Sequence, residues 1–548
     1  MGLEIIDVII LVLYAVLILG VGLYMSRSKD GIEKTSEDYF LASKSLPWWA
    51  IGTSLIAANI SAEQFIGMSG SGFAMGLAIA SYEWMAALTL IIVGKYFLPI
   101  FIEKGLYTIP EFLEKRYNSQ VKSVLAVFWV ALFVFVNLTT VLYLGGTALD
   151  TIIGNGDGSM VIYCIVGLAL FAAAYSLYGG LSAVAWTDVI QVVLLVAGGL
   201  ITTYIALDNV TDTGGVFKGL SYIYDKVPEK FNMILEPSDN GYSDLPGIAV
   251  LVGGMWIANI YYWGFNQYII QRTLAAKSLE EAQKGIVFAA VLKMIIPLIV
   301  VIPGIIAYVM FQESPDVAAQ FTNADGGIMN DKAYPWLIAT FIPSGVKGLI
   351  LAALAAAVVS SLASMLNSTS TIFTMDIYKP LINNKATERQ LVTVGRLSGV
   401  VALLIAIFIA PVLGGIDQAF QFIQEWTGVV SPGILAIFIL GLFWKKTSAK
   451  SAVIGAFVSI PIALFFKIAP KGWSSMTIFP DLPFMHQMGI TFILTVMFML
   501  VVSYFNNQGE DDEKGIEINK SLFKTSPIFN VISFAVILML VALYSIFW

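Results

Sequence analysis

The sequence has very little cysteine, histidine and charge for its length. Cys164 and His486 are the single residues of their kinds among 548, and Asp, Glu, Lys and Arg together make up 12%. One cysteine excludes an internal disulfide and a cluster of cysteine metal ligands. A Ser–His catalytic site would have to use His486, which follows Pro483 at the start of a late apolar run. Enzymes that depend on these groups are therefore the least favoured class.

What the chain has instead is apolar sequence. Apolar residues make up 58%, where a soluble protein has about 45–50%. The first apolar run follows Glu4, with no basic leader before it and no cleavage pattern after it, so we interpret it as a retained span. Runs long enough to cross ~30 Å of hydrocarbon predict an all-α polytopic membrane protein with fourteen spans, at 5–25, 47–72, 77–102, 121–147, 159–178, 183–206, 246–270, 284–311, 345–377, 391–413, 418–444, 449–468, 483–505 and 527–547.

Basic residues are distributed unevenly between alternate loops. Most of the 30 Lys and Arg residues follow spans one, three, seven, nine, eleven and thirteen, among them Arg116, Lys122 and Arg272. The side of a membrane that is richer in Lys and Arg is normally the cytoplasm. We therefore expect a multi-pass protein of the plasma (inner) membrane with both termini extracellular or periplasmic. The two longest connections, 207–245 and 312–344, fall on that same outer side.

Two spans change character halfway across. The stretch 54–72 begins apolar and becomes polar and glycine-rich at Asn59, Ser61, Glu63 and Gln64, and a second polar stretch, 256–267, interrupts the seventh span. A helix can be interrupted in hydrocarbon only where protein or a water-lined cavity takes up the freed backbone groups. Interrupted spans therefore indicate a midplane binding site with loose carbonyls for a cation. The alternative is that Asn59 and Ser61 are hydrogen-bonding contacts between packed helices.

The two interruptions lie five spans apart. Broken segments at equivalent places in two halves indicate an internal repeat, and because five is odd, the second half must run through the membrane in the opposite sense. The predicted organisation is an extra N-terminal span and cytoplasmic loop at 1–44, a first inverted repeat at 45–206, an extracellular loop at 207–245, a second repeat at 246–444 and three peripheral spans at 445–548.

Charged residues deep in a span are costly unless they face a cavity or a partner, and five qualify: Glu83, Lys95, Asp188, Lys293 and Glu425. Glu83 and Lys293 reach similar depth and could share one pocket, although a plain buried ion pair is the alternative. Nearby amides and apolar side chains on shared helix faces suit a solute with hydroxyl groups around an apolar face, such as a pyranose; they are Gln64, Asn259, Gln424, Met68 and Phe420.

The ninth span contains a small, hydroxyl-rich stretch at 355–369. Such a stretch often reflects close helix packing. The alternative is that Ser360 and Ser361 offer oxygen atoms to a hard cation, which prefers oxygen ligands. A position opposite the break at 57–60 would favour the cation.

Several long stretches resemble the sodium:solute symporter family, with the nearest resemblance to bacterial sodium/galactose (sodium/glucose) symporters. The resemblance covers residues 5–548. The stretches are ISAEQFIGMSGSG (60–72), SYEWM (81–85), YGGLSAVAWTDVIQ (178–191), NQYIIQRTLAAKS (266–278), VVSSLASMLNSTSTIF (358–373) and VSPGILAIFILGLFWKK (430–446).

The resemblance implies a leucine-transporter-like fold of inverted five-helix repeats with extra flanking helices, and sodium-driven uptake of a hexose by alternating access. It implies sugar contacts from Gln64, Glu83, Asn259, Lys293 and Gln424, stacking on Tyr262 as the inner gate, and outer closure by Met68 and Phe420. Ala86 stands where similar galactose carriers have a serine, which leaves both galactose and glucose open.

For the ion, the resemblance implies backbone carbonyls from Ala57, Ile60 and Ala357 together with the hydroxyls of Ser360 and Ser361. Asp188 would lie on the inward exit route of the ion. Ala363 replaces a hydroxyl that relatives with two sodium ions use, so one sodium ion per sugar is expected.

An ion channel and a membrane enzyme are the competing functions. A channel needs a continuous polar pore with rings of ligands, commonly from several subunits, whereas these polar residues cluster at one depth around two interruptions. The expected partners are the sodium ion, a small sugar and the lipid bilayer, without a nucleic acid or an obligatory protein partner.

Overall fold

A computed structural model of the protein describes residues 3–25, 35–106, 108–154, 158–211, 213–323, 326–413, 418–471 and 480–548. Part of the predicted first cytoplasmic loop, 26–34, lies outside the described residues. The described chain is helical apart from short connections and two isolated β-bridges, Leu46 with Ala276 and Thr322 with Ile328.

The N-terminal half of the chain forms one flanking helix and the first set of spans. Its α-helices are α1 (Ile5–Met25), α2 (Ser36–Leu41), α3 (Trp48–Asn59), α4 (Ser69–Met75), α5 (Ser81–Ile92), α6 (Leu98–Glu103), α7 (Ile109–Arg116), α8 (Ser119–Leu132), α9 (Thr139–Ile153), α10 (Val161–Gly179), α11 (Leu181–Asn209) and α12 (Val216–Lys226). Short π-helical segments join α3 to α4, α5 to α6 and α8 to α9.

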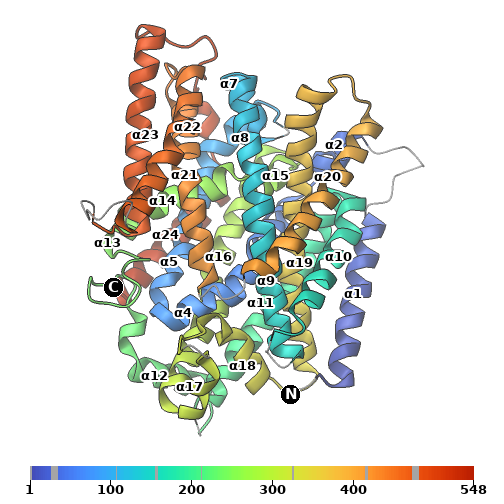
Figure 1. Ribbon diagram of the computed structural model, residues 1–548, viewed down its shortest axis with the longest axis vertical. Helices are drawn as coiled ribbons and strands as arrows, with labels where there is room; N and C mark the ends of the chain where they lie inside the picture. The colour runs from blue at the N-terminus through green and yellow to red at the C-terminus, as the bar shows by residue number, and fades with distance from the viewer. Residues whose placement is uncertain are drawn as a thin grey trace.

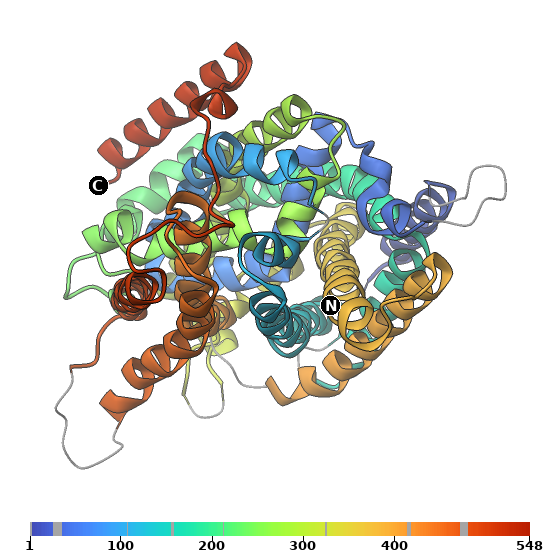
Figure 2. The same cartoon turned by 90° about the horizontal axis from the view of Figure 1, so that it is seen from above.

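The C-terminal half contains the second interrupted span and the remaining helices. They are α13 (Ile248–Val252), α14 (Gly254–Ile260), α15 (Gln267–Leu274), α16 (Leu279–Glu313), α17 (Pro315–Phe321), α18 (Ala333–Phe341), α19 (Val346–Ile372), α20 (Glu388–Ile409), α21 (Ala419–Phe443), α22 (Ala449–Ile468), α23 (Phe484–Asn507) and α24 (Pro527–Ile546). Figure 2 shows α24, the red helix beside the C-terminus, at the edge of the helical bundle.

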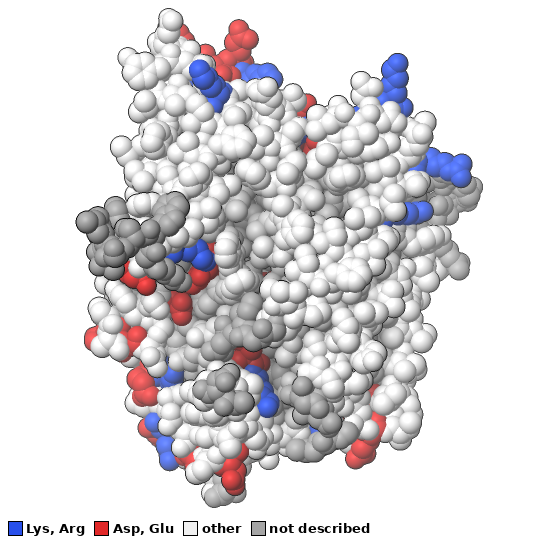
Figure 3. Space-filling model, viewed as in Figure 1, with Lys and Arg blue, Asp and Glu red and all other residues white. Residues whose placement is uncertain are grey.

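Twelve helical segments of the described chain are long and apolar enough to cross a membrane. The predicted spans 47–72 and 246–270 are not among them as continuous helices, because each is broken into short pieces. The count of fourteen is therefore not established by helix length and hydropathy, and the two spans that fall short are the two predicted to be interrupted. In Figure 3 most of the surface between the two ends of the molecule carries no charge, as a lipid-facing belt requires.

Both interruptions are visible in the backbone. After α3 the chain becomes extended at Ile60 and resumes as the π-helical segment Glu63–Met68 before α4. In the other interrupted span, the π-helical segment Tyr261–Phe265 ends at the extended residue Asn266, from which α15 begins. The two breaks contact each other, because the Asn59 side chain donates a hydrogen bond of 3.0 Å to the Tyr262 hydroxyl.

Both termini lie on the same side as the two long connections. Figure 1 places the N-terminus at the end of the molecule that holds α12, α17 and α18. At the other terminus, the Phe547 carbonyl accepts a hydrogen bond of 2.6 Å from Met233 in the first long connection. The orientation of both termini relative to the membrane stays a prediction from the charge pattern of the loops.

The flanking helix α1 supplies a cap for α19, the helix that carries the hydroxyl-rich stretch. α19 follows Gly345, which has a positive φ of 84°, and has no side-chain cap of its own. Asp7 of α1 is buried and accepts hydrogen bonds from the backbone N–H groups of Gly345, at 2.8 Å, and Gly348, at 2.7 Å. A carboxylate at a helix N-terminus satisfies these donors and is stabilised by the helix dipole.

We expect Asp7→Ala to lower the stability of the protein, because the buried N–H of Gly348 and the half-buried N–H of Gly345 would lose their acceptor. The expected loss is about 1–3 kcal/mol, the usual cost of an unsatisfied buried group. Thermal unfolding in detergent measures it. Asp7→Asn keeps one acceptor oxygen and should lose less stability than Asp7→Ala. Equal melting temperatures for Asp7→Ala and the unchanged protein would contradict the capping role of Asp7.

Candidate functional site

A small polar cavity lies where the two interrupted spans meet. Its volume is about 50 Å³, room for only a few water molecules, so a larger solute requires the walls to move. Seven of the eight residues predicted to contact a sugar line it: Gln64, Glu83, Asn259, Tyr262, Lys293, Phe420 and Gln424. Met68, the eighth, is buried but does not line the cavity.

Glu83 and Lys293 form an ion pair inside this cavity. The Lys293 ammonium, on α16, bonds to both Glu83 Oε2 of α5 and the Asn59 amide oxygen at the end of α3. It also lies 4.9 Å from the centre of the Trp263 ring, within cation–π distance. Both charged side chains are almost fully buried, with exposures of 3% and 1%. The pair therefore joins both interrupted spans to two uninterrupted helices.

Tyr262 forms one wall of the cavity at the second break. Its hydroxyl group accepts from the Asn59 amide and from the Tyr268 hydroxyl, the latter at 2.8 Å. Its ring packs edge-on against Trp263 at 5.2 Å. Because Tyr262 bonds to the first break and lies beside the second, movement of either break displaces its ring.

Substitutions at Tyr262 should separate the ring from the hydroxyl group. Tyr262→Phe keeps the ring over the cavity and should retain solute uptake, whereas Tyr262→Ala opens the wall and should reduce uptake by at least about tenfold, equivalent to 1.4 kcal/mol. Initial rates of uptake in proteoliposomes measure both. Equal rates for the alanine variant and the unchanged protein would refute a gating role.

The opposite side of the cavity is closed by aromatic side chains. Phe420 of α21 packs edge-on against Tyr82 of α5 with ring centres 5.0 Å apart. A Cβ atom at Gly67 would lie 2.9 Å from that of Phe420, so this close approach requires glycine. Met68 follows Gly67 directly and is fully buried.

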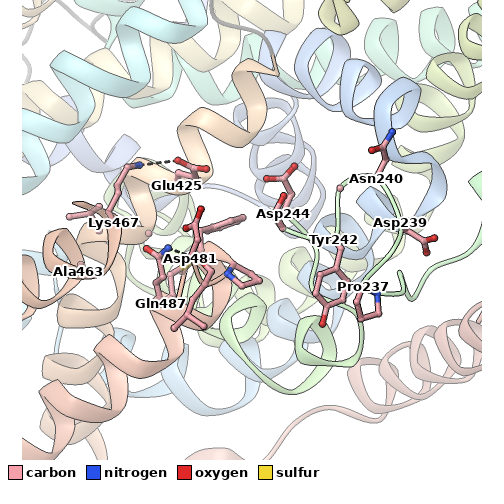
Figure 4. A pocket seen from close by; sticks show the side chains of 18 residues that line it. Pro237, Asp239, Asn240, Tyr242, Asp244, Glu425, Ala463, Lys467, Asp481 and Gln487 are labelled. Atoms are coloured by element: carbon pink, nitrogen blue, oxygen red, sulfur yellow. Dashed lines mark hydrogen bonds and ion pairs between the residues drawn. The ribbon is translucent and has the colours of Figure 1, made fainter. Parts of the chain in front are cut away.

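A larger vestibule of about 570 Å³ lies beside this closure and shares Gly428 and Met488 with the wall of the cavity. Its described lining is mainly acidic. Among the described residues that line it, Lys467 supplies the one ammonium group, which pairs with Glu425 at 2.9 Å, the contact drawn as a dashed line in Figure 4. The other carboxylates that line the vestibule are Asp239, Asp244 and Asp481. Burial, assisted by the charge of Glu425, raises the pKa of Asp244 to about 6. The vestibule therefore loses negative charge as the pH falls through that value.

The first break frees two of the backbone carbonyls that were predicted to bind the ion. In a continuous helix the Ser61 and Gln64 N–H groups would bond to the carbonyls of Ala57 and Ile60. Instead, Ser61 N–H donates to the Gln64 side chain at 2.9 Å and Gln64 N–H donates to the Ser61 carbonyl at 3.2 Å. Ala57 and Ile60 are both fully buried, so their freed carbonyls face protein or a bound ion.

The hydroxyl-rich face of α19 lies against this break, the position that would favour a cation over simple helix packing. The Ser361 hydroxyl donates to the Ala58 carbonyl at 3.0 Å, and the Ser360 hydroxyl donates to Asp188 Oδ1 at 2.5 Å. Ala357 lies one turn before Ser361 on the same helix and is fully buried. The structure thus places Ser361 of α19 against the end of α3, with the Asp188 carboxylate bonded to the neighbouring Ser360.

Asp188 in turn belongs to a buried network that the sequence analysis did not predict. Its Oδ2 accepts from Ser54 at 2.5 Å and from the Arg272 guanidinium at 3.3 Å. Arg272 also donates to Ser54 at 2.6 Å and bonds to Ser364 of α19. Arg272 was counted among the basic residues of the loop after the seventh predicted span, but it is only 1% exposed. The position of Arg272 directly after an interrupted span is the sequence feature that could have indicated its part in the site.

Other cavity residues were not among the predicted solute contacts, although Glu63 was noted as part of the polar interruption. Glu63, Tyr82 and Ser431 line the cavity, and each has a buried oxygen atom without a hydrogen-bond partner among the described residues. In contrast, two charged residues predicted to be deep within spans lie elsewhere: Lys95 is partly exposed beside the Tyr96 ring, and Glu425 lines the vestibule.

Two interrupted helices that meet at a polar cavity, with freed carbonyls beside a face of hydroxyl groups, define a secondary transporter. The chain belongs to the sodium:solute symporter family, whose profile matches residues 39–459. It is therefore a sodium-coupled transporter and not an enzyme.

Relatives with curated descriptions match over most of the chain. A sodium/glucose cotransporter of Vibrio parahaemolyticus is 60% identical over 553 residues, which cover 100% of this chain and 99% of the relative. Sodium/myo-inositol cotransporter 2 of Sus scrofa is 34% identical over 487 residues, which cover 84% of this chain and 69% of the relative. Solutes of more than one kind are thus represented among these relatives.

Solved structures share the fold. A Na⁺-coupled sialic acid symporter in a substrate-bound outward-open state superposes with a TM-score of 0.77 at 27% identity, covering 92% of this chain and 98% of that one. The nucleobase-cation-symport-1 family transporter MHP1 superposes with a TM-score of 0.50 at 13% identity, over 88% of this chain and 98% of its own, and is similar in fold alone. The expected all-α, leucine-transporter-like class is confirmed, without the exact number of spans.

Proposed function

We propose that the protein carries a hexose, glucose or galactose, into the cell together with one sodium ion, by alternating access between the repeats 45–206 and 246–444. Sodium-coupled sugar transport is supported by the 60% identical relative, which is described as a sodium/glucose cotransporter. The observation that carries the proposal is the cavity itself. Amides, an ion pair and aromatic faces converge there from the two interrupted spans and from α5, α16 and α21, the combination that a hydroxyl-rich ring requires.

In this proposal Gln64, Glu83, Asn259, Lys293 and Gln424 contact the sugar, Tyr262 is the inner gate and Phe420 with Met68 closes the outer side. Sodium binds the carbonyls of Ala57, Ile60 and Ala357 and the hydroxyls of Ser360 and Ser361, and leaves past Asp188. The freed carbonyls and the Ser361–Ala58 contact support this placement. For the ion to bind, both serine hydroxyl groups must turn their protons away from the site.

The same proposal places the protein in a bacterial inner membrane with both termini in the periplasm. The bonds of Asp7 to the end of the second long connection and of Phe547 to the first support a common side for the termini. The excess of Lys and Arg in the opposite loops makes that side the outer one.

Uptake of radiolabelled glucose, galactose and myo-inositol into proteoliposomes, with and without an inward sodium gradient, tests the function. We expect concentrative uptake of a hexose that stops when the gradient is removed, with sodium and sugar entering in equal numbers. Myo-inositol is included because relatives carry that name. Equal uptake with and without sodium would indicate a passive pathway and overturn the proposal.

A further inference from the structure

The solute cavity contains one more carboxyl group than it has cations. Of its three charged residues, Glu83 and Lys293 bond to each other. Glu63 is 7% exposed, and its Oε1 accepts no hydrogen bond from any described residue. The other nearby cation is also occupied, because Arg272 is held by Asp188. Glu63 is thus a buried acid without a countercharge, and neither the ion pair nor the ion site accounts for it.

Local structure directs Glu63 to the cavity. Its backbone N–H bonds to the Ser61 hydroxyl at 2.9 Å, which fixes the start of the π-helical segment. The adjacent Gln64 uses its amide oxygen to accept from both the N–H and the hydroxyl of Ser61, so that oxygen holds the break together. The neighbouring acid, which the break does not use, is left to line the cavity.

The protonation state of Glu63 follows from its surroundings. An isolated carboxylate removed from water is strongly disfavoured and takes up a proton instead. The charged and titratable groups that share the cavity are Glu83 and Lys293, which cancel, and the hydroxyl groups of Tyr82 and Tyr262, with Tyr268 behind Tyr262. None of them supplies a positive charge to Glu63. When the cavity is closed, the side chain is therefore a neutral carboxylic acid that can both donate and accept a hydrogen bond.

We propose that Glu63 is a further solute-binding residue, whose neutral carboxyl group hydrogen-bonds to a hydroxyl group of the transported solute when the cavity closes around it. The inference rests on the proposed function, because it takes the solute to be a sugar. Closure over the solute then requires a proton on Glu63, so the apparent affinity for sugar falls as the pH rises.

A cycle of variants and sugar analogues tests the contact. Binding of the hexose and of its monodeoxy analogues is compared at saturating sodium for the unchanged protein, Glu63→Gln and Glu63→Ala. Glutamine resembles the neutral acid and should retain affinity, whereas alanine should weaken binding by about tenfold, as for the loss of one buried hydrogen bond. The monodeoxy analogue that lacks the hydroxyl group bound by Glu63 should bind the unchanged protein and Glu63→Ala equally well, because it makes no contact with Glu63 in either protein. Equal losses for all analogues, or no loss for any, would overturn the proposal.

The pH dependence supplies a second readout. The affinity of the unchanged protein should decrease as the pH rises, because an ionised carboxylate cannot donate a hydrogen bond to the solute and is costly to bury, and Glu63→Gln should show no such decrease. Glu517→Gln removes an exposed carboxylate, which pairs with Lys445 at 3.1 Å, and is the matched control. Identical pH profiles for the unchanged protein and Glu63→Gln would contradict the proposal.

A failure of the sugar assignment would be recognised separately. If the unchanged protein binds no hexose in the presence of sodium, the proposed function fails. The protonation state of Glu63 can still be tested by infrared spectra of the sodium-free protein. The spectrum should contain a carboxylic-acid C=O band that is lost in Glu63→Gln and kept in Glu517→Gln. Absence of that difference would show that Glu63 is ionised and would overturn the inference.

Discussion

Glu83→Gln should weaken sodium-driven sugar uptake by about tenfold or more. The variant keeps the shape of the side chain but removes the charge that pairs with Lys293. A hydrogen bond to a charged group contributes about 1.5–3 kcal/mol, and the buried Lys293 ammonium would lose its counterion. The affinity for glucose and galactose, measured by competition in proteoliposomes, gives the size of the effect.

A double variant distinguishes solute ligands from a structural ion pair. Removing one partner of a buried pair is strongly destabilising, by about 3–5 kcal/mol, whereas replacing both can be neutral. Glu83→Gln combined with Lys293→Met should therefore regain thermal stability. If the two residues bind sugar, this stable double variant will still take up none. Recovered uptake would show that the pair is only structural.

Ser361→Ala should sharply raise the sodium concentration needed for half-maximal uptake. The Ser361 hydroxyl lies 3.0 Å from the Ala58 carbonyl at the first break, beside the carbonyls freed by that break. Removing one of a few oxygen ligands of a hard cation should weaken its binding by about tenfold or more. Sugar affinity at saturating sodium should remain unchanged, because the sugar cavity does not include Ser361. Sodium titration of uptake measures both quantities.

Ser368→Ala is the matched control for this prediction. It removes a buried hydroxyl from the same helix, where Ser368 bonds to the Gln271 side chain at 2.8 Å and not to the break. Its sodium requirement should equal that of the unchanged protein. A normal sodium requirement in Ser361→Ala would mean that the cation binds elsewhere.

The positions of the interruptions and the residues around them could be predicted from sequence, because polar groups in hydrocarbon are rare enough to require a cavity. The pairing of Glu83 with Lys293 followed from their similar depths alone. In contrast, Arg272 was assigned to a loop, since sequence gives its distance from the span end but not the rotation of the short helix α15 that buries it. The rotation of a helix about its own axis, and with it the burial of a side chain, depends on packing partners that are distant in the chain.

The small size of the cavity is a further feature that sequence could not indicate. Gln64 was predicted as a sugar contact, yet its amide oxygen is used by Ser61 in this conformation. Asn59 similarly bonds to both Lys293 and Tyr262. The sequence identifies side chains that can bind a solute. Which bonds these side chains make when no solute is bound depends on how closely the walls of the cavity approach each other.

The Arg272 network bears on how completely the protein conserves the energy of a sodium gradient. Arg272 joins α15, which follows one break, to Ser54 of α3, which precedes the other, and to Asp188. If Asp188 lies on the exit route, an ion cannot leave while these bonds are intact. An ion that arrives without solute is then returned to the outside, because nothing has opened the network. Sodium leak in the absence of sugar, measured as isotope flux, should accordingly be slow, and each gradient-driven entry of sodium should carry a sugar with it.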